Sequence, residues 1–158
     1  MSKIENIGKL EKLSKNTADT ESLAKDIYLA IKNNGNLHID LQGNIGAGKT
    51  CFARHLINCF GMKGVLSPSF QTVLSYQKEQ FEIHHLDLFR LPLSSELPED
   101  LWEIVEKDSL RLVEWPERCS NLPKPDIMIS FDLLENDHRL IKLIPVSESG
   151  AFCLKKLI

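Results

Sequence analysis

The segment Gly43-Asn44-Ile45-Gly46-Ala47-Gly48-Lys49-Thr50 matches the phosphate-binding pattern G-x-x-x-x-G-K-[ST]. Its glycines allow positive φ angles and let the backbone approach a phosphate closely. Backbone N–H groups then surround the anion, and the positive end of the following helix dipole adds to the attraction. In such a loop Lys49 would reach the β- and γ-phosphates of a nucleotide, and the Thr50 hydroxyl would hold Mg²⁺.

The flanking sequence supplies the strand and the helix that this loop requires. Residues 37–41 alternate in polarity as a strand does, and residues 49–60 form the expected helix, which ends at Gly61. Cys51 lies in the first turn of that helix, so we count it among the candidate nucleotide-binding residues. The plain alternative is a Gly-rich turn before an ordinary helix, and the matching context favours the phosphate site.

The rest of the chain predicts an α/β fold. The further strands expected are 10–15, 65–66, 71–76, 81–88, 110–113, 126–134 and 139–146, and the further helices are 20–33 and 93–105, the latter interrupted by Pro98. Polar turns join 71–76 to 81–88 and 126–134 to 139–146, as in hairpins. Strand–helix–strand units together with hairpins predict a single P-loop NTPase domain with a mixed parallel and antiparallel sheet flanked by helices.

Length and composition place residues 1–158 in one domain. The chain has 42% hydrophobic and 26% charged residues, which is typical of a globular protein. Its net charge of −3 is unlike the basic balance of proteins that grip nucleic acid, so any RNA is expected to be reached through a partner. Four cysteines without C-x-x-C spacing, no apolar leader and no membrane-length apolar run predict a cytoplasmic protein.

Two carboxylates at the ends of predicted strands are candidates for the chemistry beside the loop. Asp87 lies near the end of one strand, and Glu114 directly follows another. Ligands of α/β sheets bind beyond the carboxyl ends of the strands. Phosphoryl transfer needs a carboxylate that holds Mg²⁺ or its waters and a group that positions the nucleophile. We therefore expect Asp87 and Glu114 to complete the site with Lys49.

His38 and Asp40 depart from the apolar pattern of a central parallel strand, because they share one of its faces. We interpret them as a satisfied polar pair, buried or at a sheet edge, rather than as catalytic groups.

Several segments resemble the bacterial TsaE (YjeE) family, the ATPase of tRNA threonylcarbamoyladenosine biosynthesis. Residues 43–50 resemble the family's G-x-L-G-A-G-K-T loop, and Ser67-Pro68-Ser69-Phe70 resembles its S-P-T-[YF] segment. His85-Leu86-Asp87-Leu88-Phe89-Arg90-Leu91 resembles its H-[FL]-D-L-Y-R-L motif, and Val113-Glu114-Trp115 resembles its [IV]-E-W motif. Residues 122–126 resemble the stretch before its last hairpin. The resemblance spans about residues 19–146.

This resemblance implies a small P-loop fold that binds ATP and hydrolyses it slowly in a complex with the TsaB and TsaD proteins. The TsaD partner transfers threonylcarbamoyl to adenosine 37 of tRNAs that read ANN codons. The ATPase is required for repeated turnover of that complex, so the tRNA is met only indirectly.

The resemblance also implies roles for single residues. Asp87 would bind Mg²⁺ with Thr50, while Glu114 would orient or activate the attacking water or support Mg²⁺ in a Walker-B-like way. Trp115 would lie near the nucleotide or a partner. Residues 67–69 would belong to a loop that senses the γ-phosphate.

The chain departs from the family pattern at four places. Ser69 replaces a threonine but keeps the hydroxyl, Gln71 replaces a second threonine, and Phe89 replaces a tyrosine. The segment 96–102 diverges after its first two residues, which suggests a different partner-facing loop.

Two other functions stay open from the residues themselves. A small-molecule or nucleotide kinase would need a lid with arginines that clamp the transferred phosphate, and the arginines of this chain are scattered. A non-catalytic nucleotide-binding regulator would keep Lys49 and Thr50 and could dispense with Glu114. The presence of both Asp87 and Glu114 favours the ATPase.

Overall fold

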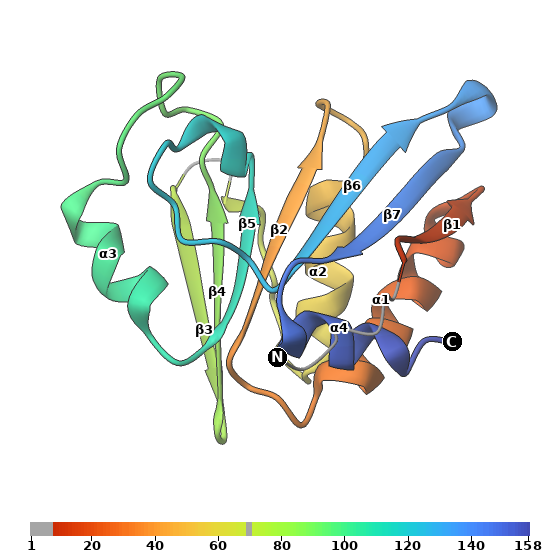
Figure 1. The fold of residues 1–158 in the computed structure, drawn as a ribbon, viewed down its shortest axis with the longest axis horizontal. Helices are drawn as coiled ribbons and strands as arrows, with labels where there is room; N and C mark the ends of the chain where they lie inside the picture. Colours follow the sequence, from red (N-terminus) through yellow and green to blue (C-terminus); the bar gives the residue numbers. More distant parts are fainter. Residues whose placement is uncertain (1–7, 69–70) are drawn as a thin grey trace.

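The computed structural model describes residues 8–68 and 71–158, whose strands form one seven-stranded sheet in the order β1-β7-β6-β2-β5-β4-β3 (Figure 1). The strands are β1 (Leu10–Ser14), β2 (Leu37–Gly43), β3 (Val73–Lys78), β4 (Phe81–Asp87), β5 (Leu110–Glu114), β6 (Ile127–Leu133) and β7 (Arg139–Pro145). Strands β6, β2, β5 and β4 run parallel, and β7, β1 and β3 add antiparallel pairs at the two ends. The predicted α/β fold with a mixed sheet is confirmed.

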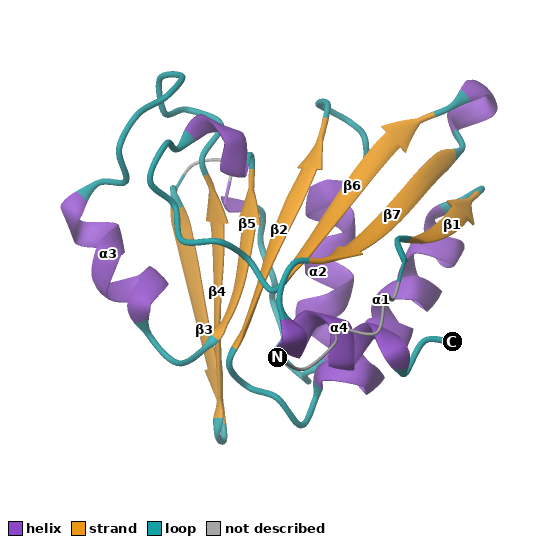
Figure 2. Cartoon of the chain, viewed as in Figure 1, coloured by secondary structure: helices purple, strands orange, loops and turns teal. Residues whose placement is uncertain are grey.

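The helices divide between two apolar cores (Figure 2). They are α1 (Thr17–Ile31), α2 (Lys49–Cys59), α3 (Glu99–Glu106) and α4 (Glu148–Lys155). Helices α1, α2 and α4 share the larger core with one face of the sheet, while α3 covers β4 and β5 from the other face. In the described residues, no helix is both long enough and apolar enough to cross a membrane.

Helix boundaries differ from the sequence expectation where side chains cap the backbone. Helix α1 begins three residues early, because the Asn16 side chain accepts a hydrogen bond from the Asp19 N–H at 2.9 Å. Helix α3 begins only at Glu99, directly after Pro98. The expected strand at 65–66 is wrong, since these residues pair with no strand in the described chain.

Helix α4 has no counterpart in the sequence expectations. It is short, and isolated helices of this length are marginal without tertiary packing. The Ser147 hydroxyl caps it by accepting from the Gly150 N–H at 3.1 Å, and Cys153 and Leu154 enter the larger core. A Cβ at Gly150 would lie 1.9 Å from the Asp126 carbonyl oxygen, so only glycine lets α4 pack here.

The sheet register brings three chain segments to one edge. In the parallel pairs, Leu41 of β2 lies opposite Glu114 of β5, and Asp87 of β4 lies opposite the same Glu114. The loop that follows β2 therefore begins beside both carboxylates. Ligands of open α/β sheets bind at this edge.

Candidate functional site

The Gly-rich loop joins β2 to α2 through backbone conformations that favour glycine. Gly48, the N-cap of α2, has a φ of 109°. Gly43 ends β2 so close to β6 that a Cβ there would lie 2.7 Å from the Phe131 carbonyl oxygen. The loop therefore turns sharply and presents the first N–H groups of α2, which have no partner inside the helix.

Lys49 lies inside this loop with 5% of its surface exposed. Its ammonium group donates to the carbonyl oxygens of Gly43 and, at 3.0 Å, Asn44, and it lies 4.2 Å from the centre of the Trp115 ring. Burial lowers the pKa of Lys49, and the nearby Glu114 carboxylate opposes that shift. The cation is thus held at the loop by carbonyl dipoles and an aromatic face.

Thr50, Glu114 and His85 form a continuous hydrogen-bonded chain. The Thr50 hydroxyl donates to Glu114 Oε1 at 2.6 Å, and His85 Nε2 lies 2.8 Å from Glu114 Oε2. Glu114 and His85 are 1% and 0% exposed. Each carboxylate oxygen of Glu114 therefore has its own partner, one from α2 and one from β4.

Asp87 is the second carboxylate at this edge of the sheet. Its side chain accepts a hydrogen bond from the Phe89 N–H at 3.0 Å. Burial raises the pKa of Asp87; that hydrogen bond lowers it, and the negative charge of Glu114 raises it further. A cation placed between these two carboxylates would relieve their repulsion.

The donors at this edge fit a magnesium ion. Mg²⁺ prefers oxygen ligands and is commonly held by one or two carboxylates, phosphate oxygens and water. Asp87, Glu114 and the Thr50 hydroxyl supply hard oxygen atoms beside the loop. These are the residues that the sequence analysis expects to hold the ion, and that role stays a prediction.

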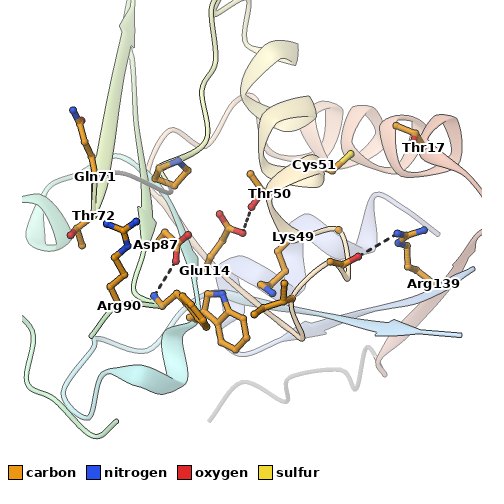
Figure 3. A pocket seen from close by; sticks show the side chains of 16 residues that line it. Thr17, Lys49, Thr50, Cys51, Gln71, Thr72, Asp87, Arg90, Glu114 and Arg139 are labelled. Atoms are coloured by element: carbon orange, nitrogen blue, oxygen red, sulfur yellow. Dashed lines mark hydrogen bonds between the residues drawn. The ribbon is translucent and has the colours of Figure 1, made fainter. Parts of the chain in front are cut away.

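A cavity of about 670 Å³ opens over the loop (Figure 3). Its lining is Thr17, Ile45, Gly46, Gly48, Lys49, Thr50, Cys51, Pro68, Gln71, Thr72, Asp87, Phe89, Arg90, Glu114, Trp115 and Arg139. The cavity thus gathers Lys49, Thr50, Cys51, Asp87, Glu114 and Trp115, all expected from the sequence. Gly43, Asn44 and Ala47 lie outside the lining and contribute loop backbone.

Trp115 covers the loop lysine from the end of β5. It adopts a left-handed conformation with a φ of 58°, which is uncommon outside glycine. Its ring packs on Phe89, with 4.9 Å between the ring centres, and the Arg118 guanidinium lies over both rings. Phe89, where the family has tyrosine, therefore keeps an aromatic contact at the cavity wall.

Arg139 is the main site residue that sequence reasoning missed. Its guanidinium donates to the carbonyl oxygens of Ala47 at 3.2 Å and Gly46 at 3.3 Å, and also to that of Asp137. It comes from the first residue of β7, and Figure 3 shows it pointing toward the loop. Thr17, Thr72 and Arg90 also line the cavity without having been expected.

The expected γ-phosphate-sensing segment is described only in part. Pro68 lines the cavity, whereas Ser69 and Phe70 lie outside the described residues. Gln71 and Thr72 both line the cavity, so a threonine hydroxyl is present one position after the expected one.

The expected pairing of His38 with Asp40 is wrong. β2 is a central strand, so neither residue lies at a sheet edge. In the described chain, Asp40 Oδ1 and His38 Nε2 are buried without a hydrogen-bond partner. Burial raises the pKa of Asp40 to about 7, although the fully buried Arg111 cation nearby opposes the shift.

The sheet, the Gly-rich loop and the carboxylates beside it define an α/β protein of the P-loop class. The family model described as threonylcarbamoyl adenosine biosynthesis protein TsaE matches residues 14–141. The chain belongs to this TsaE family, as the sequence resemblance implied.

Individual relatives agree with this assignment. The chain is 32% identical to the tRNA threonylcarbamoyladenosine biosynthesis protein TsaE of Rickettsia felis, over 86% of this chain and 80% of that protein. It is 33% identical to the TsaE protein of Haemophilus influenzae, over 79% of this chain and 80% of that protein. The crystal structure of Bacillus subtilis YdiB superposes with a TM-score of 0.76 at 22% identity, covering 97% of this chain and 96% of that one, which shows a shared fold.

Proposed function

We propose that the chain binds Mg-ATP in the cavity over its Gly-rich loop and hydrolyses it as the ATPase component of tRNA threonylcarbamoyladenosine synthesis. The observation that carries this proposal is the convergence of Lys49, Thr50 and two carboxylates on one cavity of about 670 Å³. That volume suits a nucleotide-sized ligand, since ligand pockets commonly measure about 300–1,000 Å³.

Each residue has a role that follows from its place. The loop N–H groups and Lys49 would bind the phosphates, with Lys49 exchanging its loop carbonyl partners for phosphate oxygens. Thr50 and Asp87 would hold Mg²⁺, which neutralises the charge on the phosphates when bound. Glu114 would stay bonded to the Thr50 hydroxyl and orient the ion's ligands or the attacking water.

The partners in this proposal are TsaB and TsaD, with tRNA reached through them in the cytoplasm. The names of the TsaE relatives describe them as proteins of tRNA threonylcarbamoyladenosine biosynthesis. The net charge of −3 supports docking to proteins in preference to direct contact with the tRNA backbone. Arg111 is fully buried in the sheet and is therefore unsuited to a phosphate-clamping kinase lid.

The deciding experiment depletes this protein in its host and measures modified nucleosides of bulk tRNA by mass spectrometry. Threonylcarbamoyladenosine should fall on depletion and recover with the wild-type chain, while Lys49→Ala should fail to restore it. An unchanged level of the nucleoside after depletion contradicts the proposed function.

A further inference from the structure

His85 lies beneath the candidate site with its ring fully buried. It belongs to β4, two residues before Asp87, and β4 pairs in parallel with the strand that ends in Glu114. Its Nε2 atom lies 2.8 Å from Glu114 Oε2. A carboxylate accepts hydrogen bonds and donates none, so the ring proton in this contact is on Nε2.

We propose that His85 is a positioning residue that fixes the orientation of the Glu114 carboxylate. This role rests on the proposed ATPase function. The terminal torsion of a glutamate is broad, so its carboxylate has no preferred orientation of its own. Thr50 holds one oxygen and His85 holds the other, and together they define the plane of the carboxylate.

The contact with Glu114 is the only hydrogen bond of the His85 ring within the described residues. Its other ring nitrogen, Nδ1, is buried and has no hydrogen-bond partner there. A buried polar ring costs free energy unless its hydrogen bonds compensate. The one hydrogen bond of the ring goes to the Glu114 carboxylate beside the loop, as expected of a residue that positions this carboxylate.

His84 provides the natural comparison, because it is adjacent in β4 and is only 2% exposed. Successive strand residues face opposite sides of a sheet, so His84 points away from the loop. Its Nδ1 lies 2.7 Å from the Ser75 hydroxyl, across the β3–β4 hairpin. One histidine thus stabilises the hairpin, while its neighbour contacts Glu114.

The test compares His85→Phe, which keeps the ring but removes the donor, with His84→Phe as the matched control. ATP affinity is measured by calorimetry in EDTA and during a Mg²⁺ titration, and hydrolysis is measured with the TsaB and TsaD proteins. We expect His85→Phe to keep the affinity measured in EDTA. In the Mg²⁺ titration, the Mg²⁺ concentration that gives half of the gain in ATP affinity should rise about 10- to 100-fold in this variant. Its kcat should fall by a similar factor of about 10- to 100-fold. His84→Phe should keep both values.

A second pair of variants separates positioning from packing. His85→Gln places an amide N–H near the Nε2 position and should restore most of the Mg²⁺ response. His85→Asn is one methylene shorter, so it should resemble His85→Phe. The positioning role is overturned if His85→Phe and His85→Asn respond to Mg²⁺ as the wild type does. It is also overturned if His84→Phe loses as much as His85→Phe, or if His85→Gln does not recover the Mg²⁺ response. A wild-type chain that binds no Mg-ATP overturns the proposed function first, and the role of His85 with it.

Discussion

The Thr50 hydroxyl lies 2.6 Å from Glu114 Oε1, although 64 positions separate the two residues in the chain. The bond joins the first turn of α2 to the end of β5. A threonine hydroxyl can give a lone pair to a metal ion while its O–H group donates a hydrogen bond to a carboxylate. In the proposed Mg-ATP complex, the Glu114 carboxylate would therefore orient the Thr50 hydroxyl toward Mg²⁺.

Replacement of Glu114 by glutamine tests the role of its charge. Glu114→Gln keeps the shape of the side chain but cannot accept from both Thr50 and His85 in the same way. We expect ATP to bind with nearly unchanged affinity in EDTA and hydrolysis with TsaB and TsaD to fall at least about 10²-fold. Single-turnover hydrolysis assays measure this loss. A normal hydrolysis rate in the variant contradicts the assigned role.

Replacement of Lys49 by alanine tests the phosphate site itself. Lys49 belongs to the loop and donates to the Gly43 and Asn44 carbonyl groups of that loop. Losing its bonds to phosphate should cost about 1.5–3 kcal/mol, which weakens ATP binding roughly 10- to 150-fold. Calorimetry with ATP measures the change, and the thermal stability without nucleotide serves as the control for folding. Wild-type affinity in a folded Lys49→Ala chain would remove the loop from the proposed site.

Replacement of Arg139 by alanine tests whether β7 pre-organises the loop. Arg139 holds the Gly46 and Ala47 carbonyl groups, so that their orientation is set before any phosphate arrives. Loss of two hydrogen bonds of about 0.5–1.5 kcal/mol each should weaken ATP binding by at most about 5- to 150-fold. Arg54, which is exposed on α2 and lies outside the cavity lining, gives the control Arg54→Ala. Equal affinities of the two variants would show that the loop needs no support from β7.

The sequence predicts the site best where the chain itself dictates the geometry. The loop spacing defines a local turn, and carboxyl ends of parallel strands meet at one edge, so Asp87 and Glu114 could be placed beside the loop. This rule about the carboxyl ends of strands did not predict Arg139, because Arg139 is the first residue of its strand. β7 runs antiparallel to β6, and its first residue therefore returns to the same edge of the sheet.

Buried polar residues are harder to predict, because their partners are distant in sequence. The contact of His85 with Glu114 could not be predicted, since nothing in the strand pattern names Glu114 as its neighbour. Asp40 was expected in a satisfied polar pair, but its Oδ1 atom is buried without a hydrogen-bond partner in the described chain. Such contacts depend on strand order, which local patterns do not specify.

Asp40 leads to a prediction about stability and pH. Burial raises its pKa to about 7 in the folded chain, above the ordinary value of 3.8 for an exposed aspartate. Between about pH 4 and 7 the folded state therefore binds more protons than the unfolded state, so the free energy of unfolding falls as the pH rises. This decrease in the free energy of unfolding is complete above the pKa of Asp40 in the folded chain and amounts to about 4 kcal/mol.

Asp40→Asn removes this titration, so urea unfolding of wild type and variant should diverge with rising pH. The free energy of unfolding of wild type should fall relative to the variant from pH 4 to pH 7 and stay lower at pH 8. Burial lowers the pKa values of His38 and His84, which destabilises the fold toward acid pH in both chains, so the difference between the curves isolates Asp40. Parallel curves across this range would mean that Asp40 is ionised in the folded protein, with Arg111 compensating its charge.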